Sequence, residues 1–336
     1  MSTTAPVTPE RLMQFAWGYA PTLAIEAAIR HRVFDVLDNS PKTLAEAVTA
    51  TGASERGLRG IMNVLTGLGF LARSGEKYTL TPESEAFLVS TKPSFQGGIF
   101  KHTSQQLLPK WLGLNDVVAT GKPVRTVNAE DDGTAFFKSF VQDIFPLSYP
   151  AAQVLGRHLA LGAKQGAVRV LDLAAGSGVW GIALAQGAPN VQVTAFDWDG
   201  VLPATKSVVE RFGLTPRFDF IAGDLNTFPF GGNFDVATLG HILHSEGAAK
   251  GKALLKKTFD ALKPGGTIAI ADFLVNDDRT GPPGPLIFAV NMLVNTDDGD
   301  TFSFEEISAW LKDAGFVDAR LLDAPGPSPL VLATKP

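Results

Sequence analysis

The chain has 336 residues, of which 45% are hydrophobic and 19% charged, and this predicts a globular protein of about two domains. Its net charge of −5 argues against a nucleic acid or an anionic membrane held by bulk charge. Cysteine is absent, which excludes disulfides, thiolate metal sites and a cysteine nucleophile. No apolar run reaches membrane-spanning length and no leader-like start is visible, so we expect a cytoplasmic protein.

Residues 1–105 show a pattern of helices followed by a hairpin. Apolar spacing predicts helices over Glu10–Leu37, Lys42–Thr51 and Glu55–Leu68. Two short strands around Ser74-Gly75 follow the third of these segments. Helices followed by a hairpin are the pattern of a winged helix.

A winged helix can bind DNA, and the charge of this segment tests that interpretation. Residues 1–105 hold ten lysines and arginines against nine acids, and the expected recognition helix carries only Arg56 and Arg59. DNA-binding domains concentrate more positive charge than this. The pattern therefore favours a protein–protein role in which the apolar first helices pack on a second subunit, giving a homodimer through the N-terminal domain and no nucleic-acid partner.

Residues 106–336 are predicted to form the second domain. Residues 106–160 within it are expected to be helical and carry many aromatic side chains, among them Phe145. Each aromatic residue alone is expected to lie in a core. Together they could wall an apolar pocket for a planar substrate.

Strands and helices then alternate to the end of the chain. This alternation predicts a parallel sheet with helices on both faces, and ligands of such sheets bind beyond the carboxyl ends of the strands. The expected strands are Val170–Leu173, Val191–Phe196, Phe218–Ala222, Phe234–Leu239, Thr267–Ala271, Ala319–Leu322 and Leu330–Thr334.

The first strand leads into a turn of small residues. Gly176-x-Gly178-x-x-Gly181 fits the dinucleotide fingerprint, with Asp197 where that fingerprint places a ribose-binding acid. The strand itself also carries an acid, Asp172. The arrangement Asp172-x-Ala174-x-Gly176-x-Gly178 resembles the first motif of S-adenosylmethionine-dependent methyltransferases, with Ala174 in place of a glycine.

Further motifs follow in the order and spacing of one group of these enzymes. They are His31-Arg-Val-Phe-Asp-Val-Leu37, Val170-Leu-Asp-Leu-Ala-Ala-Gly-Ser-Gly178, Phe196-Asp-Trp-Asp199, Ala222-Gly-Asp-Leu225, Ile242-Leu-His244 and Ala261-Leu-Lys-Pro-Gly-Gly266. Together they resemble the O-methyltransferases of the hydroxyindole and caffeate type. The resemblance implies an α/β fold: a class I methyltransferase with a Rossmann-like, mostly parallel sheet and an N-terminal all-α/winged-helix dimerisation domain.

The resemblance also implies S-adenosyl-L-methionine as the methyl donor and S-adenosyl-L-homocysteine as the product. Asp197 would accept the ribose hydroxyls and Asp224 the adenine amino group. At Gly240 the family often has a lysine that contacts the cofactor. The full expected cofactor set is Asp172, Gly176, Ser177, Gly178, Asp197, Trp198, Asp224, Leu225 and Gly240.

His244 is the expected general base, because an unperturbed histidine titrates near neutral pH. Asp272 stands where the family has an acid that orients this histidine, and a second orienting acid falls near Asp300, one residue out of register. The expected substrate-binding residues are His241, Met292, Asn295 and Phe145. The acidic run Asp297–Asp300 lacks EF-hand spacing, and the metal-dependent catechol methyltransferases lack the N-terminal domain, so we expect no metal.

The predicted activity is O-methylation of a small, aromatic, secondary-metabolite-like acceptor. Three alternatives stay open on the sequence. One keeps the fold and the cofactor but methylates nitrogen or carbon, or performs non-methylating chemistry. The others are a winged-helix DNA-binding regulator and a nicotinamide dehydrogenase. The identity of the acceptor is not encoded in any motif.

Overall fold

The computed structural model describes residues 7–127, 133–134, 136–137 and 141–336. The chain divides into two compact units, Met1–Leu108 and Pro109–Pro336. The division lies three residues beyond the predicted boundary at 105/106. Within the described residues, no helix combines the length and apolarity needed to cross a membrane.

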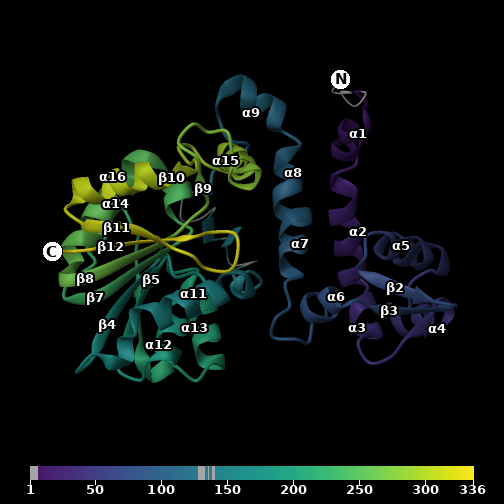
Figure 1. The fold of residues 1–336 in the computed structure, drawn as a ribbon, viewed down its shortest axis with the longest axis horizontal. Coiled ribbons are helices and arrows are strands. Elements are labelled where there is room, and N and C mark those ends of the chain that lie inside the picture. Colours follow the sequence, from purple (N-terminus) through teal and green to yellow (C-terminus); the bar gives the residue numbers. More distant parts are fainter. Residues whose placement is uncertain (1–6, 128–132, 135, 138–140) are drawn as a thin grey trace, which may run out of the picture. The chain divides into compact units, whose positions relative to one another are not determined.

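The first unit contains the predicted helices and hairpin (Figure 1). Its core forms around α5, where Leu58, Met62 and Leu65 share one buried face. The sequence did not reveal β1, whose Lys42 pairs with Tyr78 of β3 and extends the hairpin to three strands. The elements are α1 (Glu10–Ala16), α2 (Tyr19–Arg30), α3 (Val33–Leu37), β1 (Lys42–Thr43), α4 (Leu44–Thr51), α5 (Glu55–Gly67), β2 (Leu71–Ser74), β3 (Lys77–Leu80), α6 (Pro82–Phe87), α7 (Gly98–His102) and the π-helix Thr103–Leu107.

The second unit is a seven-stranded sheet in the order β11-β12-β8-β7-β4-β5-β6. Every strand pair is parallel except the two that β12 makes, so the predicted mostly parallel sheet is confirmed. The strands are β4 (Val168–Leu173), β5 (Val191–Asp197), β6 (Phe218–Ala222), β7 (Phe234–Gly240), β8 (Leu262–Ala271), β11 (Val317–Leu322) and β12 (Leu330–Thr334), beside a parallel pair of β9 (Leu274–Val275) and β10 (Phe302–Ser303).

One predicted boundary is wrong. We expected a turn at 263–266 with a strand starting at Thr267, but β8 begins at Leu262. The register against β7 shifts between Phe234 and Val236, and this irregularity accommodates the Pro-Gly-Gly sequence inside the strand.

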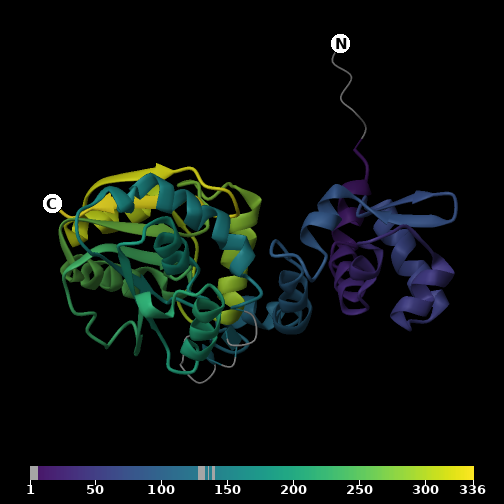
Figure 2. The same cartoon turned by 90° about the horizontal axis from the view of Figure 1, so that it is seen from below.

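Helices cover both faces of the sheet (Figures 1 and 2). Alternate residues of β4 point to opposite sides, so Val168 and Val170 join one core cluster while Leu171 and Leu173 join the other. The first cluster packs against α11, α12 and α13, and the second against α14 and α16. The helices are α8 (Leu108–Trp111), α9 (Leu114–Thr120), α11 (Phe145–Leu159), α12 (Val179–Gly187), α13 (Leu202–Arg211), α14 (Leu243–Ala261), α15 (Pro283–Asn295) and α16 (Phe304–Ala314).

The turn between β4 and α12 has left-handed backbone at three alternate residues. Ala174, Gly176 and Gly178 have φ of 51°, 55° and 74°. Glycine adopts this conformation without strain, whereas alanine does so at a cost of about 1 kcal/mol. Ala174 therefore stores strain at the point where the predicted motif substitutes alanine for glycine.

Replacing Ala174 with glycine tests that strain. The relief offsets the entropy that glycine adds to the unfolded chain, so A174G should melt at or above the wild-type temperature. The neighbouring Ala175 is 4% exposed and has no positive φ, so A175G should melt about 2 °C lower. Thermal denaturation of both variants measures this, and equal losses would contradict the strain.

Candidate active site

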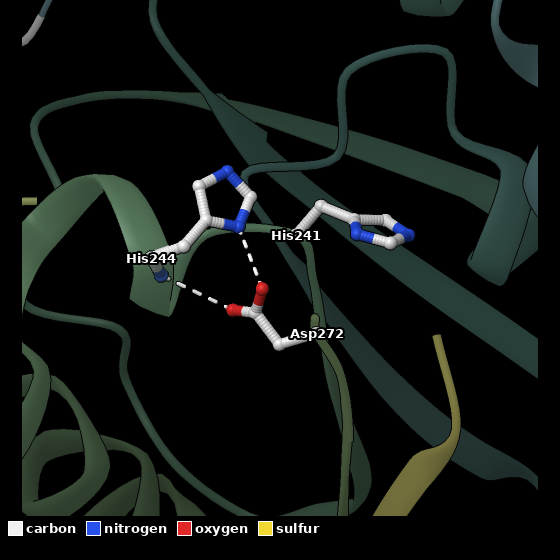
Figure 3. A group of neighbouring side chains, drawn as sticks. All are labelled: His241, His244 and Asp272. Carbon is white, nitrogen blue, oxygen red and sulfur yellow. Dashed lines mark hydrogen bonds and ion pairs between the residues drawn. The ribbon is translucent and has the colours of Figure 1, made fainter. Parts of the chain in front are cut away.

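A histidine and an aspartate meet at the carboxyl edge of the sheet. His244 is the second residue of α14, which follows β7, and Asp272 directly follows β8. The Asp272 carboxylate accepts hydrogen bonds from the backbone N–H of His244 at 3.1 Å and from its Nδ1 at 2.6 Å (Figure 3). The expected pairing of these two residues is present, and both side chains are buried.

The electrostatics of the pair fix the proton on one side of the imidazole. Burial raises the pKa of Asp272, but the hydrogen-bonded His244 and the Phe273 amide outweigh it and hold the pKa below its usual value. Asp272 is then an ionised acceptor, so Nδ1 of His244 carries the donated proton. The lone pair of His244 lies on Nε2, on the side of the ring away from Asp272 (Figure 3).

Two phenylalanines that the sequence analysis did not select border this histidine. The ring of Phe288 on α15 meets His244 edge to face at 4.9 Å, and Phe273 lies 5.9 Å from it, centroid to centroid. Phe273 and Phe288 stack on each other at 4.0 Å. Phe145, the aromatic residue selected from sequence, instead stacks with Phe212 in the core on the α11–α13 side of the sheet.

His241 lies beside the pair in an unusual backbone conformation. Its φ is 59°, and its N–H donates to the Ala271 carbonyl at 2.8 Å. Its Nδ1 is buried and has no hydrogen-bond partner among the described residues. Burial lowers the pKa of His241 to about 4, so the ring is neutral. A strained residue with an unsatisfied buried nitrogen is typical of a ligand contact.

His241, His244 and Asp272 also have the spacing of a metal site, and they form the one such group found within the described ranges. The Nδ1 of His244 is hydrogen-bonded to Asp272, so Nε2 is the ring nitrogen of His244 whose lone pair is available to a ligand or a proton. The absence of a metal stays a prediction.

Asp197 lies opposite the turn after β4. It accepts hydrogen bonds from the Gly176 N–H at 2.8 Å and from the Trp198 N–H at 2.7 Å. Burial raises the pKa of Asp197 to about 6, despite these two bonds. The predicted ribose acceptor is therefore held against the glycine turn, and Ser177 and Gly178 complete that turn before α12.

Asp172 lies in β4, two residues before Ala174 begins the turn, and is fully buried. Its carboxylate accepts from the Thr238 hydroxyl at 2.7 Å and from the Gly181 N–H at 3.0 Å. A Cβ at Gly181 would come within 2.7 Å of the Val193 side chain, so this glycine allows close packing of helix on sheet. Asp172 therefore ties the first turn of α12 to β4 and β7.

Two expected cofactor residues, Gly240 and Trp198, each lie next to an aromatic side chain. A Cβ on Gly240 would stand 1.9 Å from Nε1 of Trp180, so only glycine fits there and the indole fills the space. Trp180 is itself buried and belongs to the core cluster on the α11–α13 side of the sheet. Trp198 is in ring contact with Phe137 at 6.1 Å.

The loop after β6 carries Asp224 and Leu225. The Asp224 carboxylate accepts from the Asn226 N–H at 2.6 Å, which forms a tight turn. Leu225 packs against the core cluster beneath α14.

The remaining expected site residues are Met292, Asn295 and Asp300. Met292 is buried on α15, the helix that carries Phe288. Asn295 is also buried there, and its side chain bonds Lys110 at 2.8 Å and the Asn291 carbonyl at 2.8 Å. The Asp300 carboxylate accepts from the Thr301 N–H and lies 3.9 Å from Arg279, whereas its backbone N–H donates to the His244 carbonyl at 2.9 Å.

A mostly parallel sheet whose strand ends carry these carboxylates, with a histidine–aspartate pair beside β8, defines a class I methyltransferase. The O-methyltransferase domain family matches residues 134–317, and the O-methyltransferase dimerisation domain family matches residues 13–90. The chain belongs to the O-methyltransferase family. It is therefore an S-adenosylmethionine-dependent methyltransferase, and the predicted cofactor is confirmed.

Similar proteins match over almost their full length. The tetracenomycin polyketide synthesis 8-O-methyl transferase of Streptomyces glaucescens is 29% identical, over 98% of this chain and 97% of its own. The 3-hydroxy-5-methyl-1-naphthoate 3-O-methyltransferase of Streptomyces sahachiroi is 29% identical, over 97% and 95%. A crystal structure of a candidate O-methyltransferase from Nostoc punctiforme is 27% identical, with a TM-score of 0.90 over 98% of this chain and 100% of that one.

Proposed function

We propose that this enzyme methylates a hydroxyl group of a small aromatic molecule, with His244 as the general base. The observation that carries the proposal is the buried His244–Asp272 pair, which turns Nε2 of His244 away from Asp272 beside Phe288. When bound, the cofactor supplies a methyl group activated by a sulfonium. The protein has to align the acceptor with that methyl group and accept the hydroxyl proton.

Each member of the pair has one task. Nε2 of His244 takes the proton from the acceptor hydroxyl, and the ionised Asp272 stabilises the imidazolium that results. A base positioned in this way contributes about 10²–10⁴-fold to the rate. The ring orientation is fixed because Asp272 holds both the backbone N–H and Nδ1 of the same residue.

Support for an aromatic acceptor comes from the walls of the site. The stacked Phe273 and Phe288 offer flat apolar surface next to His244. Two relatives are named for a tetracenomycin polyketide and a hydroxylated naphthoate, which are aromatic acceptors. The unpartnered Nδ1 of His241 would then bond a second polar group of the acceptor, with Met292 as an apolar contact.

On the cofactor side we assign Asp197 to the ribose hydroxyls and Asp224 to the adenine amino group. Asp197 is anchored to Gly176 in the turn that would lie under the cofactor, so its carboxylate is preorganised. Trp198 and Leu225 follow these two acids directly and supply apolar surface. The acceptors and the glycine turn fit this cofactor, because a carboxylate suits paired hydroxyls and left-handed glycines permit close approach.

We further propose a homodimer built on the first unit. The α1 helix buries none of its residues, and Leu12, Phe15 and Trp17 on and beside it are 71%, 72% and 61% exposed. Apolar side chains exposed in such a row mark an interface, and the dimerisation family begins within this helix. A cytoplasmic location stays a prediction from the sequence, which fractionation of cells would test.

Replacing His244 with alanine tests the base. Turnover with a naphthol that the wild type accepts should fall about 10²–10⁴-fold, while the affinity for S-adenosylhomocysteine stays unchanged. The loss should shrink as the acceptor's own pKa falls, because an ionised hydroxyl needs no base. H158A, which alters an exposed histidine of α11, is the control, and wild-type turnover in H244A would refute the assignment.

The raised pKa of Asp197 predicts a pH-dependent affinity for the cofactor. Ribose hydroxyls donate to the ionised carboxylate, so below pH 6 a proton must leave before binding. Calorimetry should show S-adenosylhomocysteine binding about tenfold weaker at pH 5 than at pH 8. D197N keeps Asp172 and every histidine. It should bind S-adenosylhomocysteine weakly, with the same affinity at pH 5 and at pH 8. The same pH slope in D197N would contradict the role of Asp197.

A charge on α1 tests the dimer. F15D should shift the protein from dimer to monomer in size-exclusion chromatography with light scattering, because a carboxylate would be buried unpaired in the interface. L112D, at an apolar residue 82% exposed and outside the dimerisation match, should leave the mass unchanged. A wild-type protein that is monomeric at micromolar concentration would overturn the proposal.

A further inference from the structure

The residue that carries the base belongs to a short turn set apart from the rest of its helix. Gly247 interrupts α14 with φ 74° and ψ 174°, a non-helical conformation. A Cβ there would stand 2.3 Å from the Asp298 carbonyl, so the interruption also brings two backbones close together. The turn Leu243–Glu246 is therefore not positioned by the helical hydrogen bonds of the longer segment after Gly247.

Three contacts anchor this turn from three different segments. Asp272 holds His244 from the end of β8. The Asp300 N–H donates to the His244 carbonyl. At the far end of the turn, the carboxylate of Glu246 accepts a hydrogen bond from the side-chain amide of Asn226 at 3.1 Å.

The third anchor leads to the adenine side of the site. Asn226 lies two residues after Asp224, and its own N–H closes the turn on the Asp224 carboxylate. The Phe228 carbonyl, two residues further on, accepts from Lys257 on the longer segment of α14 at 3.0 Å. The loop after β6 is thus tied to α14 on both sides of the Gly247 interruption.

Glu246 is an unusual residue for this task. It is 7% exposed, and burial raises its pKa, with the Asn226 bond and Lys250 opposing that rise. A buried carboxylate is costly unless it is hydrogen-bonded, so its contact with Asn226 is a specific one rather than a solvated surface pair. The exposed Asn226 supplies the bond without being buried itself.

We propose that Glu246 is a positioning residue that couples the adenine-side loop to the turn carrying His244. Occupying the subsite at Asp224 orders the loop, and the Asn226–Glu246 bond transmits that order to the base. The inference rests on the proposed function, in which Asp224 contacts adenine and His244 is the base. Cofactor binding then prepares the site for the acceptor before the acceptor arrives.

Exchanging the two groups tests the bond itself. N226D places two carboxylates 3.1 Å apart and should lower kcat and raise KM for S-adenosylmethionine, reducing kcat/KM about tenfold. N226D/E246Q restores a donor and an acceptor with reversed roles and should return kcat/KM to within about threefold of wild type. E246Q alone keeps an oxygen acceptor for Asn226, so its loss of kcat/KM should be smaller than that of N226D. N226A, at an exposed position, removes the donor without adding charge and serves if N226D folds poorly.

Hydrogen exchange gives a readout that does not depend on which residue is the base. Adding S-adenosylhomocysteine should slow exchange of the amides of residues 243–247 in wild type, in E246Q and in the double variant, but not in N226D or N226A. Exchange in the glycine turn at 176–181 should slow in all of them. D260N, which breaks the exposed Lys256–Asp260 pair further along α14, is the matched control and should behave as wild type.

The outcomes separate the two proposals. If H244A keeps its activity, the base assignment fails, while the exchange pattern still judges the coupling. If S-adenosylhomocysteine slows amide exchange at residues 243–247 in N226D and N226A as it does in wild type, the coupling is wrong. It is also wrong if the kcat/KM of the double variant is no higher than that of N226D.

Discussion

The buried carboxylate of Asp172 is the contact on which the arrangement of the site depends. It joins β4, to which it belongs, with Thr238 of β7 and Gly181 of α12 through two hydrogen bonds. These elements meet where the strand order reverses, because β5 and β6 lie on one side of β4 and β7 on the other. Ligands of open α/β sheets bind at this reversal. One fully buried side chain therefore ties the start of α12 to two neighbouring strands at the point where we propose that the cofactor binds.

The two halves of the site are built differently. On the cofactor side, the groups are held by backbone: the Gly176 N–H fixes Asp197, and the Asn226 N–H fixes Asp224. On the proposed acceptor side, the Asp272 side chain just after β8 holds a short turn, and the rings of Phe273 and of Phe288 on α15 border it. The Gly247 interruption lies between these halves, and the Asn226–Glu246 hydrogen bond is the link that we propose between them.

The strand ends could be predicted from the sequence because buried parallel strands read as short apolar runs, and the residue after each run lies at the ligand edge. Asp172, Asp197, His244 and Asp272 follow from that rule and the family motifs. Phe273 and Phe288 do not, since only the packing of α15 against the β8 end shows which aromatic rings border His244. Phe145 stacks with Phe212 in the core cluster on the α11–α13 side, and its contact with the acceptor stays a prediction. Asp300 was expected to orient His244 through its carboxylate, but its backbone N–H makes the contact instead.

The buried carboxylates at the ligand edge of the sheet would attract the charged methyl donor more strongly than the product. Burial raises the pKa of Asp172 to about 7 and that of Asp197 to about 6, so ionising them without a nearby cation costs free energy. S-adenosylmethionine carries a positive sulfonium, which favours the ionised carboxylates, whereas S-adenosylhomocysteine has lost that charge. The attraction between this edge and the cofactor would therefore be weaker for the product than for the donor. With His244 as the proposed base, an imidazolium paired with Asp272 would remain after methyl transfer, and the weaker attraction at the sheet edge would favour release of the product.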